Sequence, residues 1–160
     1  MQSTESNGTT VHKDITFTVA IGNQWLNCFT ITGSVLVQRL WGIVSAVTTF
    51  TNCTSACFDL NDGAATIQLT AASGVLSGMP VGTIFAKAGL AAAAFVVLDN
   101  TAGDVGESTV PLEWSESIVT QKSGQPTYLR MGISTTDNPV AVVMRISCQW
   151  VPLTPGSKVT

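Results

Sequence analysis

The sequence contains few charged residues. Asp, Glu, Lys and Arg make up 11% of its 160 residues, whereas a soluble domain usually carries about 25%. Thr, Ser, Gly, Ala, Asn and Gln take their place, so we expect a polar but weakly charged surface. Charges keep copies of a protein apart and are depleted at the centres of protein interfaces. The composition therefore favours a domain that packs against other subunits.

The charges that are present argue against a polyanionic partner. The formal net charge is −3 and the isoelectric point is about 4.8. The seven Lys and Arg residues are scattered along the chain, and no two are adjacent. Nucleic acids and anionic membrane surfaces are bound by clustered basic side chains. We therefore expect neither a nucleic acid nor a membrane as partner.

His12 is the single histidine. A Ser-His-Asp or Cys-His mechanism would need it as the base, held beside a nucleophile, and a metal site made of several histidines is excluded. Residues 1–12 are polar and lack an apolar core, so we expect a flexible N-terminal arm. His12 ends this arm, and we expect it to be exposed to solvent.

No segment reads as a targeting signal or a membrane span. The most apolar run covers residues 90–98 (LAAAAFVVL), and nine residues are too few to cross a bilayer as a helix. A Gly-Lys-Ser/Thr phosphate loop is also missing. We therefore expect no secretion and no cofactor.

Four cysteines leave the redox state open: Cys28, Cys53, Cys57 and Cys148. Two disulfides with three alternative pairings fit this number, but without a secretion signal reduced thiols are favoured. Cys53 and Cys57 have three residues between them, and a zinc site would need the other two cysteines from distant strands. Cys148 lies on the apolar side of its expected strand, which is typical of a buried free thiol.

Acidic residues offer two further candidate sites. Glu113 and Glu116 flank Trp114, which fits a sugar platform with neighbouring carboxylates but is also typical of an edge strand kept soluble by charge. A calcium site would draw on Asp59, Asp62, Asp99 and Asp104, without the spacing of known calcium loops. We expect no catalytic, cofactor-binding or metal-binding residues, and no enzymatic activity.

Period-two alternation is the strongest structural signal, and it predicts strands with one buried face over residues 14–21, 128–133 and 140–151. The residues expected to point inward are Ile15, Phe17, Val19, Ile21, Leu129, Met131, Ile133, Val140, Val142, Met144, Ile146, Cys148 and Trp150. Residues 35–47 are apolar on both sides, which predicts a long central strand. Within it, Gly42 indicates a bulge or a close approach by a neighbouring backbone.

Turn residues divide the rest of the chain. Asn61-Asp62-Gly63 predicts a hairpin between strands at residues 57–60 and 65–70. Weaker strands are expected at residues 27–32, 82–86, 92–98, 109–114 and 118–121. Helix signals are poor: residues 71–79 leave room for one turn before Pro80, but Ser73, Gly74 and Gly78 disfavour it. A polar loop is expected at 99–108, and turns at 123–126 and 135–139. Short strands separated by turns predict an all-β fold, either an antiparallel β-sandwich or a jelly-roll-like barrel. Residues 13–160 would form this single domain.

Three segments carry a family resemblance: residues 29–47 (FTITGSVLVQRLWGIVSAV), 65–89 (ATIQLTAASGVLSGMPVGTIFAKAG) and 149–160 (QWVPLTPGSKVT). Together they resemble small β-rich structural proteins of tailed bacteriophages, described as head decoration, head fibre or tail components. The resemblance covers about half of the chain. Arg39 and Trp41 depart from the smoother aliphatic pattern of that family, which leaves a location on the head or on the tail open.

The resemblance implies a virion structural protein assembled in the host cytoplasm. We expect a capsid decoration (cement) protein, with the major capsid protein as partner and a homotrimer as oligomer. Packing against other subunits is the simplest use of a charge-poor surface. The alternative is a tail-associated or host-recognising domain that binds a surface glycan through exposed aromatics such as Trp114 or Trp25. A jelly-roll coat subunit and a hydrolase are further alternatives.

Overall fold

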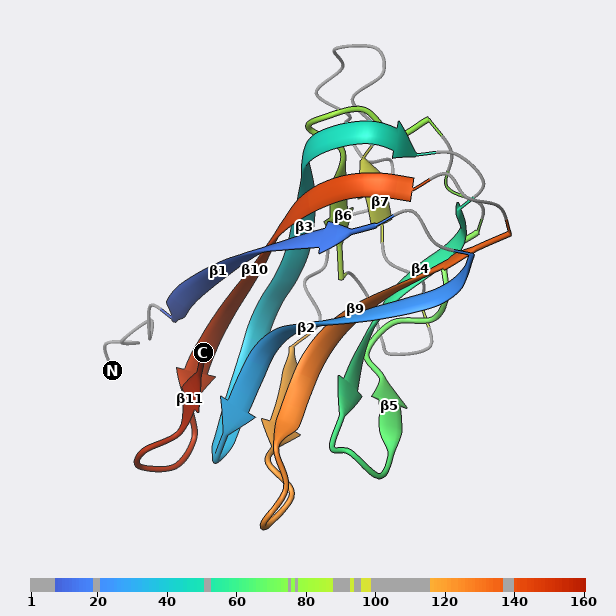
Figure 1. Ribbon diagram of the computed structural model, residues 1–160. Coiled ribbons are helices and arrows are strands. Elements are labelled where there is room, and N and C mark those ends of the chain that lie inside the picture. Colours follow the sequence, from blue (N-terminus) through green and yellow to red (C-terminus); the bar gives the residue numbers. More distant parts are fainter. Residues whose placement is uncertain are drawn as a thin grey trace.

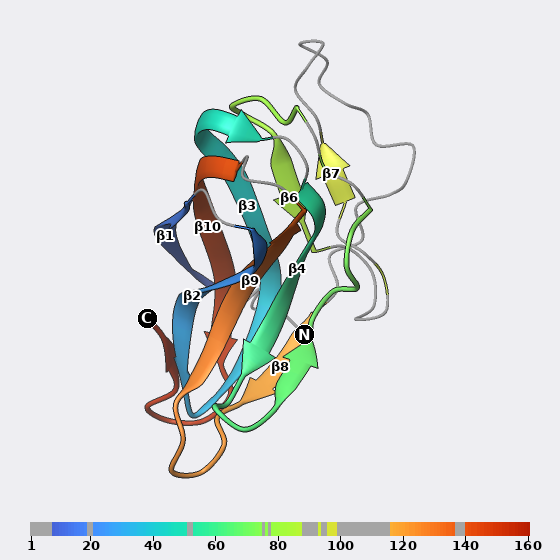
Figure 2. The same cartoon turned by 45° about the vertical axis from the view of Figure 1, so that its right-hand side comes forward.

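The computed structural model describes residues 8–18, 21–50, 53–74, 76, 78–87, 93, 96–98, 116–136 and 140–160. These residues form two antiparallel β-sheets that face one another as two layers (Figure 1, Figure 2). No helix occurs among them. The prediction of an all-β fold is confirmed.

The first layer, sheet A, is built around the two longest strands. Its order is β1 (Thr9–Phe17), β10 (Val140–Pro152), β3 (Ser34–Phe50), β6 (Ile84–Ala86) and β7 (Val96–Leu98), and β8 (Ser117–Thr120) pairs with the first residues of β3. Because β3 has neighbours on both sides, the prediction of a long central strand is confirmed.

The second layer, sheet B, has the order β11 (Lys158–Val159), β2 (Gly22–Thr32), β9 (Thr127–Thr135), β4 (Cys53–Asn61) and β5 (Thr66–Gln68). The β4–β5 hairpin turns at Asn61-Asp62-Gly63, as predicted. Gly63 has a φ of +82°, and the Asp62 carboxylate accepts hydrogen bonds from the backbone N–H groups of Ala64 and Ala65. Glycine tolerates this left-handed backbone without strain.

The chain visits the two sheets in the order of a jelly roll. Strands β1 to β4 alternate between sheets A and B, β5 stays in sheet B, and β8, β9 and β10 alternate again. The resulting neighbours are β1-β10-β3-β8 in one layer and β2-β9-β4-β5 in the other, which corresponds to two Greek keys. Strands β6 and β7 lie between β5 and β8 in the sequence, and they extend sheet A because β6 pairs with β3 and β7 pairs with β6.

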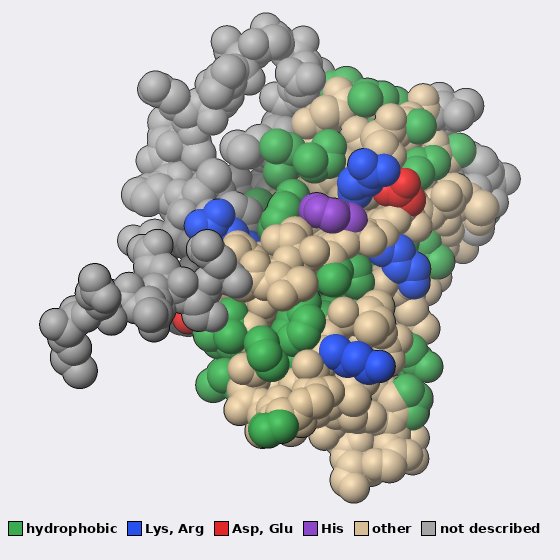
Figure 3. Space-filling model, turned by 90° about the vertical axis from the view of Figure 1, so that its left-hand side faces the viewer, with side chains coloured by type: hydrophobic (Ala, Val, Ile, Leu, Met, Phe, Trp, Pro, Cys, Tyr) green, Lys and Arg blue, Asp and Glu red, His purple; other side chains and the backbone are tan. Residues whose placement is uncertain are grey.

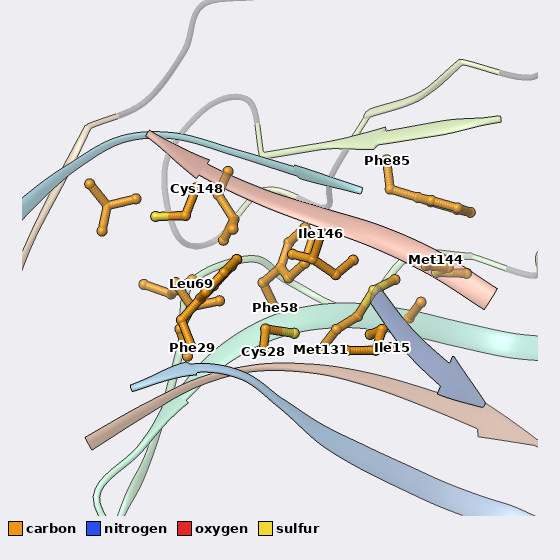
Figure 4. Close-up of a cluster of buried hydrophobic side chains, with 14 of the residues drawn as sticks. Ile15, Cys28, Phe29, Phe58, Leu69, Phe85, Met131, Met144, Ile146 and Cys148 are labelled. Atoms are coloured by element: carbon orange, nitrogen blue, oxygen red, sulfur yellow. The ribbon is translucent and has the colours of Figure 1, made fainter. Parts of the chain in front are cut away.

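The core lies between the sheets. Met144, Ile146 and Cys148 point inward from β10 and are fully buried, and Phe58 and Met131 approach them from sheet B (Figure 4). The alternation read from the sequence therefore gave the correct inward faces for β9 and β10.

The first strand lies earlier in the chain than predicted. Residues 9–12, assigned to the arm, pair with β10, because that strand continues to Pro152 and its backbone groups need partners. Residues 1–7 of the predicted arm lie outside the described residues. At its other end β1 stops at Phe17, and Ile21, predicted to point inward, is 66% exposed.

The described residues within 71–79 form no helical turn, in line with the poor helix signals of the sequence. The described residues there continue along the edge of β4, where the backbone N–H groups of Ser73 and Leu76 donate to the carbonyls of Ala56 and Cys53. The carbonyl groups along that edge of β4 accept hydrogen bonds from this segment. A helical turn rich in glycine would be less stable than this pairing. The strand predicted at 109–114 and the loop at 99–108 lie outside the described residues.

Candidate functional site

The outer face of sheet B contains a buried ion pair. Arg130 of β9 lies directly opposite Asp59 of β4. Arg130 Nε donates to Asp59 Oδ1 at 2.9 Å, and Nη2 donates to Oδ2 at 2.7 Å. The Asp59 side chain is fully buried and that of Arg130 is 16% exposed. Because each charge is matched by the other, this part of the face is close to neutral.

Trp25 of β2 covers this ion pair. Its partner across the sheet is Gly132 of β9, and a Cβ atom there would overlap the indole ring, so the glycine lets the ring lie against the strand. The guanidinium carbon of Arg130 is 4.9 Å from the ring centre, within the range of a cation–π contact. Since Trp25 is 39% exposed and Arg130 is mostly covered, the ring lies above the guanidinium and faces solvent on its other side.

A shallow hollow of about 200 Å³ lies beside Trp25. Its polar lining consists of Asn23 from β2, Ser55 from β4, Gln68 from β5 and Ser134 from β9. Within the described part of the chain, none of these four side chains forms a hydrogen bond with another residue. The hollow therefore combines one open aromatic ring with amide and hydroxyl groups that are available to a ligand.

The outer face of sheet A carries an apolar row across three strands. Leu36 of β3 is the register partner of both Val151 of β10 and Ile118 of β8, so the three side chains lie side by side. They point away from the core, because the adjacent Val35 and Val119 are buried within it. Ile118 is 71% exposed. We call these three residues the apolar row.

Charged side chains are sparse on the surface. Figure 3 shows a face of the molecule on which apolar and uncharged side chains outnumber the charged ones. This is the surface that the low charge content of the sequence predicts, and large exposed apolar side chains on such a surface are typical of contact sites.

His12 lies on the outer face of sheet A, where it is exposed as predicted, but in a strand rather than an arm. Its Nδ1 is 2.7 Å from Ser147 Oγ of β10. Ser147 is 2% exposed, so its hydroxyl has little room for a substrate. The next acid on the same side of β1, Asp14, forms two hydrogen bonds with Arg145 instead, and this contact lowers the pKa of Asp14. The geometry is that of a structural cross-strand pair.

The acidic candidates within the described residues do not come together. Asp59 pairs with Arg130, whereas Asp62 belongs to the β4–β5 turn, where hydrogen bonds from the backbone of Ala65 and Ala64 lower its pKa and Lys122 lies 3.3 Å away. Glu116 is exposed just before β8. The other four candidates lie outside the described residues: Asp99, Asp104, Glu113 and Trp114.

The four cysteines are free and buried. Burial raises the pKa of Cys28 and Cys148 to about 12 and that of Cys53 to about 11, and it also raises the pKa of Cys57. Such thiols stay protonated at neutral pH, and a protonated thiol is neither a nucleophile nor a metal ligand. Within the described residues, no group of three or more His, Cys, Asp and Glu side chains is placed to hold a metal ion.

No protein-family model, characterised protein or solved structure matches this chain. In the part of the chain that the structure describes, no helix has the length and apolar character needed to span a membrane.

Sequence reasoning identified Trp25 as an exposed aromatic but missed its partners. Strand alternation places Asn23 and Trp25 on one side of β2, yet which strand lies opposite depends on the order of strands in sheet B. Arg130 and Gly132 are more than 100 residues away in the sequence, and no local signal links them to Trp25. Only the fold brings these residues together.

Proposed function

We propose that this protein is a structural component of a virus particle, a capsid decoration protein that binds and stabilises a phage head. The observation that carries the proposal is the jelly-roll strand order, which viral capsid domains share with lectin domains and cupins, combined with a content of only 11% charged residues. The segments that resemble phage structural proteins add support from the sequence.

The proposal assigns the apolar row to the contact with the capsid shell. Ile118 and its neighbours Leu36 and Val151 lie on a sheet face that their own core does not use. Burying such side chains stabilises a complex in proportion to the apolar area removed from water, about 25 cal/mol per Å². A closed homotrimer would present three copies of this row to the shell around a threefold axis of the capsid.

The test is addition of the purified protein to phage heads that lack it. We expect binding that saturates at a fixed number of copies per head and that raises the temperature at which the heads release their genome. Light scattering on the free protein should give about three times the 16.7 kDa mass of the chain. Binding without saturation, or no binding at all, would contradict the proposal.

A pair of charge substitutions tests the assigned contact. Ile118→Asp places a charge in the apolar row, and we expect at least about tenfold weaker binding to the heads, because a charge in a dry contact loses its hydration. Ala64→Asp adds the same charge at the exposed β4–β5 turn and serves as the matched control. Equal binding by both variants would show that the apolar row is not the contact.

A further inference from the structure

We infer that the hollow beside Trp25 binds a sugar ring of an uncharged glycan. The first argument is the orientation of the indole. Gly132 provides the space in which the ring lies, and the Arg130 guanidinium supports it from below. The ring is thus ordered before any ligand arrives, so stacking costs little further conformational entropy. Pyranose rings have one face of C–H groups, which packs against an aromatic ring of this kind.

The second argument is the polar lining around the ring. Asn23 and Gln68 carry amide groups that donate and accept, and Ser55 and Ser134 carry hydroxyl groups. They come from four strands and surround the hollow. A sugar hydroxyl likewise both donates and accepts, so this set of side chains suits a polyhydroxylated ligand. A purely apolar ligand would leave these groups without partners.

The third argument is charge. Among the described residues, none that lines the hollow is an Asp, Glu, Lys or Arg. The one charged side chain that the ring contacts in this part of the structure, Arg130, is neutralised by its two hydrogen bonds with Asp59. An acidic sugar would therefore find no free cation here to compensate its carboxylate. This selects an uncharged sugar.

The position of the hollow argues against a peptide ligand. It lies mainly over β2, β9 and β4, whose backbone groups pair with one another within the sheet, and of its polar residues only Gln68 comes from the edge strand β5. An extended peptide binds to a sheet by adding to a free edge, and the centre of a sheet offers no such edge. Ligand hydroxyl groups can instead bind the side chains that stand above the sheet.

The test is nuclear magnetic resonance of the ¹⁵N-labelled protein, which reports the indole N–H of Trp25 separately from the other three tryptophans. The probes are the methyl β-glycosides of galactose, glucose and N-acetylglucosamine, with methyl sialoside as the charged comparison. We expect at least one neutral glycoside to shift the Trp25 signal to saturation with a millimolar dissociation constant, and the sialoside to leave it unchanged.

Two variants locate the binding. Gly132→Ala displaces the ring, and Gln68→Ala removes one amide from an exposed side chain without touching the core; we expect both to weaken binding at least about fivefold. Ile67→Ala, at an exposed residue outside the hollow, should bind as the unmodified protein does. If no neutral glycoside moves the Trp25 signal, or if Gln68→Ala and Gly132→Ala both bind normally, the inference is wrong. These results do not depend on binding to phage heads, so this inference and the proposed function can fail separately.

Discussion

Arg130 and Arg145 each form two hydrogen bonds with an aspartate on the adjacent strand, but the two ion pairs differ in their exposure to solvent. The Arg130–Asp59 pair is almost fully covered, whereas the Arg145–Asp14 pair is more than half exposed on the arginine side. Exposed ion pairs contribute little to stability because water competes for both charges. A buried pair behaves differently, because removal of one partner leaves the other charge without water or counterion.

Comparison of Arg130→Leu with Arg145→Leu tests this contrast. We expect the free energy of unfolding to fall by about 3–5 kcal/mol for Arg130→Leu, because Asp59 keeps its burial and loses its partner. Arg145→Leu should have a much smaller effect. Urea denaturation of both variants measures the difference, and equal losses would mean that burial does not distinguish the two pairs.

The buried thiols make stability depend on alkaline pH. An unfolded cysteine loses its proton as the pH passes 9, whereas Cys28 and Cys148 keep theirs until about 12 in the folded protein. The folded state then binds more protons than the unfolded state, so the free energy of unfolding falls as the pH rises from 9 toward 12, and these thiols contribute no pH dependence below this window.

Cys148→Ala tests the thiol contribution. We expect the variant to lose stability less steeply above pH 9 than the unmodified protein, by up to about 1.4 kcal/mol per pH unit for the one thiol removed. Urea denaturation at several pH values gives the two slopes. Lysine and tyrosine titrate in both proteins, so their effect cancels when the two slopes are subtracted. Equal slopes of the free energy of unfolding against pH for the two proteins would refute the thiol explanation.

At the scale of the element, β3 and β10 are held close together at Gly42. The sequence predicted a bulge or a backbone approach at this glycine, and the structure shows the end of a neighbouring side chain instead. A Cβ atom at Gly42 would lie 2.7 Å from Ile146 Cδ1, and Ile146 is its register partner on β10. The isoleucine fills the space that a side chain at residue 42 would occupy.

A double-mutant cycle tests this contact. Gly42→Ala should destabilise the protein by about 1–2 kcal/mol through overpacking, and Ile146→Val by about 0.5–1.5 kcal/mol through the lost methyl group. In the double variant the new methyl takes the place of Cδ1, so we expect a total cost below the sum of the two. Thermal or urea denaturation of the three variants supplies the values, and simple additivity would contradict the packing argument.

The elements that the sequence predicted well are those with a strict alternation or a strong turn signal. β9 and β10 alternate over their lengths, and Asn61-Asp62-Gly63 forces a hairpin. Local chemistry decides these cases. The start of β1 was misjudged and the segment after β5 was left undecided, because the structure of both is set by partner strands, β10 in one case and β4 in the other.

The candidate site depends even more on long-range structure. Trp25 is visible in the sequence, but its setting requires a glycine and an arginine on β9 and an aspartate on β4. Those contacts follow from the jelly-roll order, which places β9 between β2 and β4. The sequence predicted an all-β fold and left the order of strands open, so the site could not be derived from it.

At the scale of the whole molecule, the two proposed surfaces lie on opposite layers. The apolar row belongs to the outer face of sheet A, and the hollow at Trp25 to the outer face of sheet B. A subunit that rests on a capsid through sheet A would turn sheet B outward, toward the environment of the particle. The two proposals are therefore compatible: one face assembles, and the other contacts a glycan.

The measurement that tests the central claim most directly is an electron cryomicroscopy map of phage particles that have been mixed with this protein. The account predicts density for a jelly roll at symmetry-related positions on the head, with the apolar row of Leu36, Ile118 and Val151 against the shell and Trp25 facing outward. Density confined to the tail, or particles without any density for the domain, would contradict it.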